Sequence, residues 1–258
     1  MNGGLAMLID LALRANQWLA ADAKPPAVDL LWIDDTFKFI GEFSTVTSGL
    51  GRVDRAPEGT GGWFDAVRDT GAQHVRLTLN TAAGGMSPWL ASAFANGNDW
   101  GLVSVGVRPV LWRARWEVAN PSAPDRRIWR VTVTGEWTTL AAPAPDVRLS
   151  AVELDTALQA LGDFAARSGE SGWATVMQRA RSQLSAESPE CAYYPEMVPQ
   201  GSLPLDRHQL LAAATHGWIF GGMGSWNDSV QGDSDEYERV SSDLWNALTR
   251  AFMAAVNA

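Results

Sequence analysis

The sequence predicts an α+β fold, with an antiparallel sheet in the N-terminal part and a group of helices in the C-terminal part. Before residue 140, apolar and polar residues alternate in several short segments, whereas after residue 150 apolar residues recur about every 3.6 residues. The proline-rich connector "AAPAPDV", residues 141–147, separates the two patterns. We therefore expect one domain over residues 1–258, with sub-parts 1–140 (helix plus sheet) and 150–258 (helical).

The first expected element is a helix over "MNGGLAMLIDLALRANQWLA", residues 1–20. Asp10 and Arg14 interrupt its apolar stretch and its start is not basic, so an amphipathic helix fits better than a signal peptide. Residues 210–226 also lack Asp, Glu, Lys and Arg, but they are fewer than the roughly 20 residues of a membrane span. We expect this second segment to be a buried helix, and we expect no membrane segment.

The sheet is expected to contain about five strands. The turn-forming residues 34–36 separate two strand-like runs, which predicts a hairpin of residues 28–33 with residues 36–43. A short helix near residues 62–69 follows. "HVRLTLN", residues 74–80, then alternates between apolar and polar side chains and predicts a half-buried strand.

The clearest signal is a pair of strands, "PVLWRARWEV" and "RIWRVTVTGEW". Their tryptophans and valines share one face, because side chains two residues apart in a strand point the same way. An antiparallel pairing that sets Trp116 opposite Trp129 also sets Trp112 opposite Val133, and it makes one continuous apolar face. We therefore assign these tryptophans to the core.

About four helices are expected after the connector. Ser150 and Glu153 form a capping box at the start of the first helix, and Gly169 ends it. Asp206 caps the third helix. The three helices after the first are expected to cover residues 171–186, 207–224 and 235–256.

The formal net charge of −9 is concentrated in the C-terminal part. Residues 1–148 contain 14 basic and 15 acidic residues, whereas residues 149–258 contain 6 basic and 14 acidic residues. Nucleic acid is not expected as a partner, because phosphates are bound by clustered Lys and Arg. A basic protein would be attracted to this surface. The alternative is that the acidic residues only keep the protein soluble.

The composition also bears on the source and the compartment. Lys24 and Lys38 are the only lysines among 20 basic residues, a bias typical of GC-rich genomes that favours a bacterial source. A physical alternative is that Arg is used to stack on the 13 tryptophans. Cys191 is the only cysteine, so an intramolecular disulfide is impossible and a reducing compartment, the cytoplasm, is expected.

We find no motif that identifies a catalytic residue. Residues 222–226, "GMGSW", superficially match a nucleophile elbow, but the second residue after Ser225 is Asn227 instead of glycine, and a helix precedes where a strand should. The acidic neighbours of Cys191 disfavour a reactive thiolate. The three histidines are not spaced as metal ligands, and the acidic loop after Asn227 lacks the order of an EF-hand. We therefore predict no metal and no cofactor, and whether the protein is an enzyme stays open.

One candidate ligand site lies in the predicted third helix. There, Gly217, Gly221 and Gly224 would form a strip without side chains, next to Trp226. Each glycine costs about 0.5 to 1 kcal/mol relative to alanine within a helix. Such a strip therefore indicates a close backbone contact, the end of the helix, or a ligand.

The polar face of the sheet is the second candidate. The strand pairing above sets Arg115 opposite Arg130, which is unfavourable unless an anion or an acid lies between them, whereas a two-residue shift would pair Arg130 with Glu117. The alternatives are a groove for a carboxylate or phosphate, a docking face for the acidic helices, or a solvated face. The candidate ligand-binding residues of both features are Gly221, Gly222, Gly224, Trp226, Asn227, Asp228, Arg113, Arg115 and Arg130.

Three functions fit these observations. The leading hypothesis is a binding or inhibitory protein, similar to an immunity protein, whose acidic C-terminal surface engages a basic partner. The second is an enzyme or small-ligand-binding protein with its pocket between the sheet and the C-terminal helices, around the "GGMGSWND" segment. The third is a structural subunit that uses its tryptophans as interface anchors.

Overall fold

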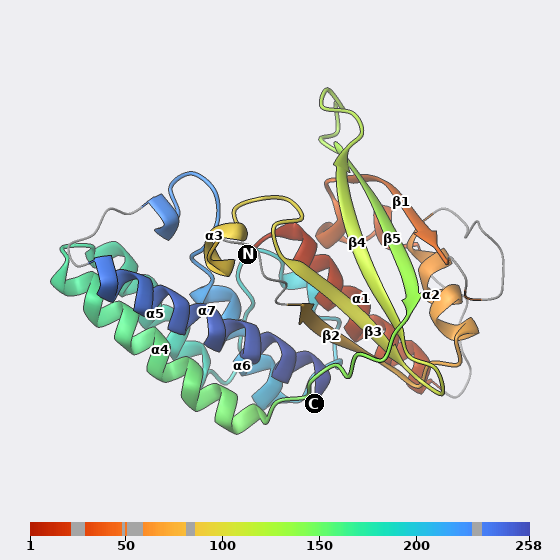
Figure 1. The fold of residues 1–258 in the computed structure, drawn as a ribbon. Coiled ribbons are helices and arrows are strands. Elements are labelled where there is room, and N and C mark those ends of the chain that lie inside the picture. The colour runs from red at the N-terminus through yellow and green to blue at the C-terminus, as the bar shows by residue number, and fades with distance from the viewer. Residues whose placement is uncertain (22–28, 48–49, 51–58, 81–85, 229–233) are drawn as a thin grey trace.

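The computed structural model describes residues 1–21, 29–47, 50, 59–80, 86–228 and 234–258 (Figure 1). In this part of the chain, five strands form one mixed sheet in the order β1-β5-β4-β3-β2. The strands are β1 (Ile40–Val46), β2 (His74–Asn80), β3 (Asp99–Val105), β4 (Val110–Val118) and β5 (Trp129–Trp137). The helices are α1 (Gly3–Ala20), α2 (Thr60–Asp69), α3 (Pro88–Ala91), α4 (Val147–Arg167), α5 (Ser171–Gln183), α6 (Leu205–Gly217) and α7 (Ser234–Asn257).

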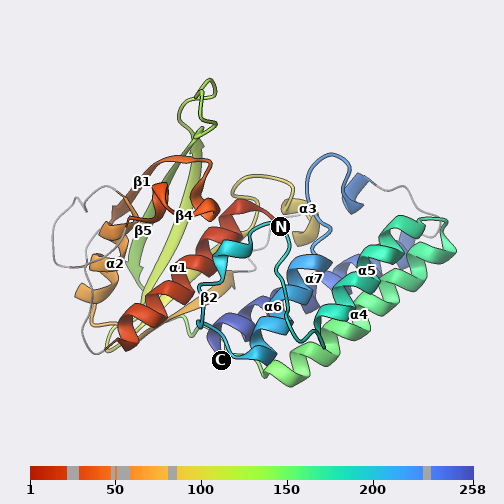
Figure 2. The same cartoon turned by 180° about the vertical axis from the view of Figure 1, so that it is seen from behind.

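The helices are distributed unevenly around the sheet. Figures 1 and 2 show α1 against one face of the sheet and α2 near β1, at one edge. The four helices α4 to α7 form a group beside the opposite edge, which is β2. The predicted α+β class is therefore confirmed, including the N-terminal helix and the four C-terminal helices. The sheet, however, is mixed and not purely antiparallel, because β1 runs parallel to β5.

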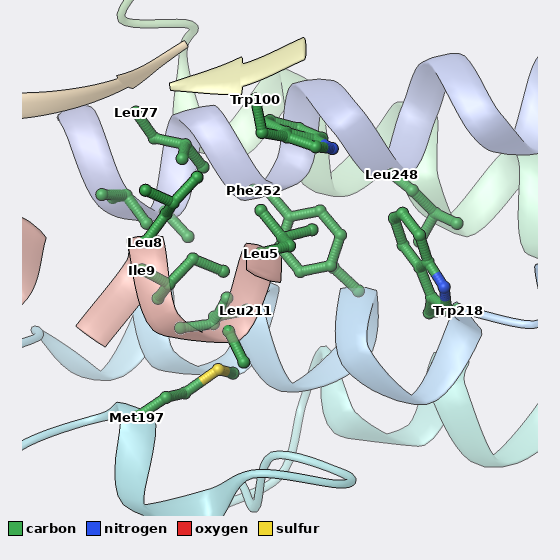
Figure 3. Packing of buried hydrophobic residues seen from close by; sticks show 14 of the residues in the cluster. Leu5, Leu8, Ile9, Leu77, Trp100, Met197, Leu211, Trp218, Leu248 and Phe252 are labelled. Carbon is green, nitrogen blue, oxygen red and sulfur yellow. The ribbon is translucent and has the colours of Figure 1, made fainter. Parts of the chain in front are cut away.

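Helix α1 is the central element of the core. The Asn2 side chain caps it by accepting a hydrogen bond from the Leu5 amide. The helix was predicted correctly, but it is not amphipathic over its first half, since every residue from Leu5 to Leu13 is buried, including Asp10. The reason is that α1 contacts the sheet on one side and α7 and the chain near Met197 on others. Figure 3 shows this packing.

The core continues from the sheet into the helical group without a break. Figure 3 shows Phe252 of α7 close to Leu5 of α1, with Trp100 of β3 and Trp218 beside it. The Phe252 ring meets the Trp100 ring edge-on at a centroid distance of 6.4 Å, and the Trp218 ring at 5.8 Å. Such aromatic pairs add to the free energy of area burial. The two sub-parts of the sequence thus share one hydrophobic cluster.

Two asparagine side chains hydrogen bond the outer edge of β2. Asn16 of α1 donates to the Val75 carbonyl at 2.9 Å and accepts from the Val75 amide at 2.7 Å. Asn257, near the end of α7, makes the same pair of bonds with Leu77, both at 2.7 Å, and also donates to the Pro143 carbonyl at 2.6 Å. A carboxamide carries one donor and one acceptor side, so each asparagine takes the place of a neighbouring strand.

The predicted hairpin over residues 28–43 is wrong. Residues Leu30–Trp32 and Asp35–Phe37 form 3-10 turns, and only β1 is a strand. Asp34, expected in the hairpin turn, is a cap instead and accepts from the Thr36 amide. Asp29, expected in the first strand of the hairpin, likewise caps a turn by accepting from the Leu31 amide. Residue 28 lies outside the described residues.

The predicted register between β4 and β5 is wrong by two residues, and the alternative that pairs Glu117 with Arg130 is the one observed. Trp116 lies opposite Val131 and Trp112 lies opposite Gly135, so Glu117, and not Arg115, faces Arg130. Gly135 explains this register, because a Cβ atom there would lie 2.4 Å from the Trp112 ring. The buried indole of Trp112 therefore needs a glycine across from it. Strand β3, which sequence analysis missed, supplies Ser104, whose hydroxyl accepts a hydrogen bond from Trp112 Nε1 at 3.1 Å.

The C-terminal helices differ from the prediction at several ends. Asp206 does not cap α6, because the helix begins at Leu205 after Pro204 and Asp206 lies in its first turn. Helix α4 starts four residues early, because Asp146 and not Ser150 caps it, by accepting from the Leu149 amide, and Ser150 is buried inside the helix. Helix α6 ends at Gly217, seven residues before the predicted end. There the chain becomes extended and Trp218 inserts into the core. None of the helices in the described ranges is long and apolar enough to cross a membrane.

We predict that Asn257→Ala lowers the free energy of unfolding by about 2 kcal/mol or more. The change leaves the buried Leu77 amide and carbonyl without partners, and each unsatisfied group costs about 1–3 kcal/mol. Urea denaturation followed by circular dichroism measures the effect. The matched control is Asn246→Ala on the exposed side of the same helix, where we expect a change within about 0.5 kcal/mol. Equal effects of the two changes would contradict the role of Asn257.

Candidate functional site

A cavity of about 240 Å³ lies where the first turn of α1 meets the ends of β3 and β4, the start of β5 and residues 92–98. The chain contributes six aromatic rings to its walls. These belong to Phe39, Phe94, Trp100, Trp116, Trp129 and Tyr194. Because the rings come from six separated points of the sequence, the cavity depends on the folded arrangement and not on one local motif.

Two glycines at the start of α1 bring polar aromatic side chains close to the helix. A Cβ atom at Gly4 would lie 3.2 Å from Trp116 Nε1, and one at Gly3 would lie 3.3 Å from the Tyr194 hydroxyl. Larger residues would push these groups away. The glycines therefore allow the indole and the phenol to approach the first turn of α1.

Residues 92–98 are held against the sheet by side-chain amides. The pairing of β3 with β4 stops at Gly101 and Arg113, and beyond this point Asn96 bonds β4 in place of β3. Its side chain accepts from the Trp116 amide at 2.9 Å and donates to the Trp116 carbonyl at 3.0 Å. Asn96 adopts a left-handed backbone conformation with φ of 59°, which asparagine tolerates better than most residues. This wall of the cavity is thus fixed before any ligand arrives.

The remaining polar residues of this wall are also engaged. The Ser92 hydroxyl donates to the Trp89 carbonyl at 2.6 Å. The Asn98 amide, oriented to satisfy both of its neighbours, donates to the Pro88 carbonyl at 3.1 Å and accepts from the Ser92 amide at 3.2 Å. These side chains build the loop and have little hydrogen-bonding capacity left for a ligand.

The cavity is electrically neutral. Of the lining residues that the structure describes, none is Asp, Glu, Lys, Arg or His. The ionisable group among them is the Tyr194 phenol, and burial raises its pKa above the ordinary value, so it stays protonated at neutral pH. The described lining residues therefore offer no charged side chain to a ligand, although the Lys38 ammonium lies 5.6 Å from the centroid of the Phe39 ring.

A buried ionic cluster lies next to the cavity. The Arg14 guanidinium bonds the Asp10 carboxylate at 2.6 Å and also pairs with Asp34. Thr36, which lines the cavity, lies close enough to Asp10 to lower its pKa slightly. Burial has the opposite and larger effect, and it raises the pKa of Asp10 to about 7 although the positive charge of Arg14 lowers it.

The predicted polar face of the sheet is present, but its arginines pair with acids. Arg113 bonds Asp99 at 3.0 Å, Arg115 lies 3.1 Å from Glu117, and Arg130 bonds Glu42 at 2.5 Å. Arg113 and Arg115 line an open cleft of about 610 Å³ on this face, whereas Arg130 does not. The juxtaposition of Arg115 and Arg130 that motivated an anion site does not occur, because the register differs.

The "GGMGSWND" segment folds as a compact turn after α6. Gly224 has a positive φ of 78°, and its amide donates to Asp228 at 2.6 Å. Trp226 is fully buried, and its Nε1 donates to Ser241 at 2.8 Å. The Asn227 side chain donates to the Gly221 carbonyl at 3.1 Å. Gly217 alone makes the expected close contact, because a Cβ there would lie 2.8 Å from Leu158.

The structure therefore separates the two halves of the predicted site. Figures 1 and 2 show the turn after α6 beside α5 and α7, at the end of the molecule far from β4. Neither the neutral cavity nor the open cleft includes any residue of 221–228. Arg113 and Arg115 lie together in the cleft, and Gly222 faces open space.

Other reactive side chains do not form a centre in the described ranges. Burial raises the pKa of the Cys191 thiol to about 12, so a thiolate is not available at neutral pH. No three residues of the types His, Cys, Asp and Glu are grouped as metal ligands in the part of the chain that the structure describes. The predicted acidic loop after Asp228 includes residues 229–233, which lie outside the described residues.

Comparison with protein-family models, curated proteins and solved structures gave no match. Sequence analysis missed the cavity, because it assigned Trp116 and Trp129 to the core. The available signal was the pair Gly3–Gly4 at the start of a strongly apolar helix, where two glycines indicate that other groups approach closely.

We predict that Asp10 makes the fold more stable as the pH falls from about 8 towards 5. Its pKa is about 7 in the folded protein, above the ordinary value of 3.8, so the folded protein binds more protons than the unfolded chain between these values. In that window the Asp10 contribution changes by up to about 1.4 kcal/mol per pH unit. Thermal unfolding of Asp10→Asn should lack this part of the pH dependence.

The control for this experiment is Asp35→Asn, which removes an exposed aspartate nearby. This variant should keep the pH dependence of the wild type. If the Asp10→Asn and wild-type curves of melting temperature against pH run parallel, the raised pKa of Asp10 is wrong.

Proposed function

We propose that the protein binds a small uncharged molecule in the cavity at the start of α1. The observation that carries this proposal is the combination of six aromatic rings with described lining residues that carry no charge. Small-molecule sites are concave and mostly apolar, with a few polar groups that orient the ligand. This function belongs to the second class that the sequence suggests, but at another place in the molecule.

The rigidity of the cavity supports binding. The Asn96 side chain ties one wall to the β4 backbone, and the N-terminal cap of Asn2 holds the opposite wall. A preformed site loses less conformational entropy when its ligand binds. Its volume of about 240 Å³ suits a small ligand.

The same observations favour binding over catalysis. General acid-base and nucleophilic mechanisms use ionisable or activated side chains that touch the substrate. The described walls offer the protonated phenol of Tyr194 and the hydroxyls of Thr36 and Ser92, without a histidine, carboxylate or lysine beside them. We therefore propose a receptor or carrier and not an enzyme.

We predict that Gly4→Leu abolishes ligand binding, because the new side chain would enter the space beside Trp116. The test is a thermal-shift screen of uncharged metabolites against wild type and variant. A ligand at 100 times its dissociation constant stabilises a protein by about 2.7 kcal/mol. We expect a positive shift in the wild type that the variant loses.

Gly172→Leu is the matched control, because a Cβ there would meet no described atom within 4 Å. This variant should respond to ligand as the wild type does. Should Gly4→Leu fail to fold, Ala93→Leu narrows the same cavity from the other side. A ligand that stabilises wild type and both cavity variants equally binds elsewhere, and a screen without any stabilising compound would contradict the proposal.

A second candidate function rests on the charge of residues 149–258, which is the basis of the immunity-like hypothesis. Four of the arginines in this region pair with acids of its own helices, namely Arg250 with Glu153, Arg181 with Asp155, Arg167 with Glu236, and Arg239 with Glu236 and Asp243. The acidic residues outnumber the basic ones by 14 to 6, so a negative excess is left after this pairing. We propose that this surface attracts a basic protein partner.

The expected outcome for this second candidate is a complex that depends strongly on ionic strength. Affinity purification at low salt should retain a basic protein, and a high-salt wash should release it, because salt screens exposed charges. Replacing Asp163 and Glu187 by Lys should weaken the complex, whereas Gly4→Leu should leave it unchanged. An interaction that survives high salt and both replacements would exclude the acidic surface as its basis.

A further inference from the structure

The polar atoms of the cavity define what kind of ligand it accepts, and this step rests on the proposed function. Trp116 Nε1 and the Tyr194 hydroxyl both lie at the first turn of α1. In the described ranges, neither has a hydrogen-bond partner in the protein, although Tyr194 is partly buried. The indole N–H can only donate a hydrogen bond, and the phenol has a proton to donate. A ligand at this polar end of the cavity therefore has to present a hydrogen-bond acceptor.

The absence of charged residues in the described lining limits which ligands the cavity can accept. A carboxylate or phosphate would also accept hydrogen bonds, but aromatic walls would desolvate it, and none of the described lining residues is a cation. The ammonium of Lys38 lies 5.6 Å from the centroid of the Phe39 ring, but Lys38 is not among the residues that line the cavity. Burying an unpaired charge is far more costly than burying a hydrogen-bonded neutral group. Aromatic rings can attract a cation, but no described carboxylate lines the cavity, and the two hydrogen-bond donors at its polar end disfavour a cation there. The ligand is therefore neutral.

The aromatic rings of the cavity wall indicate the shape of the apolar part of the ligand. Phe39 and Phe94 lie on the cavity wall and are 40% and 60% exposed, so their apolar surfaces are free to be covered. Trp129 stands against Trp116 edge-on, with ring centroids 6.0 Å apart. Aromatic faces and edges of this kind pack well on a flat ring.

A sugar is the main neutral alternative, and the hydrogen-bond inventory decides against it. A monosaccharide brings several hydroxyl groups, whereas the side chains of Asn96, Asn98 and Ser92 are already engaged with the protein backbone. Each hydroxyl buried without a partner weakens binding by roughly fivefold to more than a hundredfold, because it costs about 1–3 kcal/mol. Besides Trp116 Nε1 and the Tyr194 hydroxyl, the described lining residues leave the Thr36 hydroxyl without a hydrogen-bond partner. A ligand with one or two acceptor oxygens matches this small set of donors better than a polyol does.

We infer that the cavity binds a flat, neutral, mainly apolar ring compound that presents a carbonyl-type oxygen to Trp116 Nε1 and the Tyr194 hydroxyl. The ring lies between the aromatic walls, and the oxygen points to the start of α1. This arrangement assigns Trp116 and Tyr194 as the residues that determine specificity. The inference concerns a noncovalent complex and includes no chemical step.

Four small probes of similar size test this inference. Benzamide has a neutral carbonyl, benzoate carries a charge on the same framework, toluene lacks an acceptor, and methyl glucoside is a neutral polyol. Ligand-observed NMR and tryptophan fluorescence give their dissociation constants for wild type and Gly4→Leu. We expect benzamide to bind wild type at least tenfold more tightly than benzoate or methyl glucoside, and we expect Gly4→Leu to lose it.

Trp116→Phe and Tyr194→Phe remove the donors and keep the rings. Each variant should weaken the binding of benzamide at least fivefold, the equivalent of one hydrogen bond of about 1 kcal/mol, and should leave the affinity for toluene unchanged. Trp137→Phe lies outside the cavity and is the control, so it should change neither the affinity for benzamide nor the affinity for toluene. If the Phe variants weaken benzamide and toluene equally, the loss reflects altered packing and the assigned role of the donors is wrong.

The outcomes separate this inference from the proposed function. Binding of benzoate or methyl glucoside in preference to benzamide, lost in Gly4→Leu, would overturn the ligand class and keep the cavity as a binding site. The absence of binding by all four probes would overturn the ligand class, and the metabolite screen then decides on the cavity itself. A probe that binds Gly4→Leu with the same affinity as the wild type binds outside the cavity. This result would count against both the ligand class and the proposed function.

Discussion

The fold depends on how the outer edge of β2 is satisfied. An edge strand presents backbone donors and acceptors that need partners, and here two carboxamides from opposite ends of the chain supply them. Asn16 comes from α1 and Asn257 from α7, so the same edge fixes the central helix and the helical group. Because the direction of α1 is set in this way, its first turn reaches the ends of β3 and β4, where the cavity forms.

The elements with a strong hydrophobic period could be predicted from the sequence. Helix α1, strands β2, β4 and β5, and helix α7 were recognised because their apolar residues repeat at the period of a helix or a strand. Short polar signals were less informative. The aspartates at 34 and 35 fit a hairpin turn as well as a 3-10 turn, and only the contacts around them distinguish the two.

The remaining differences between the predicted and the observed structure arise from tertiary contacts. Alternation alone allows any even shift between β4 and β5, and the fit of the Trp112 ring over Gly135 selects one. In the same way, α6 ends at Gly217 because Trp218 turns into the core against Trp245, with ring centroids 5.2 Å apart. The candidate site was missed for the same reason. Its walls join residues 2–4, 36–40, 92–100, 114–129 and 194, which no local pattern connects.

The asparagine-covered edge also bears on how the folded protein resists aggregation. A bare edge strand is a template for pairing with a second chain. Here the template is hidden behind side chains, and the last turn of α7 has to detach before Leu77 is uncovered. Self-association through β2 is therefore limited by the frequency of this local opening, which is a smaller event than global unfolding. The resistance of the protein to aggregation during storage would then follow the stability of one helix end.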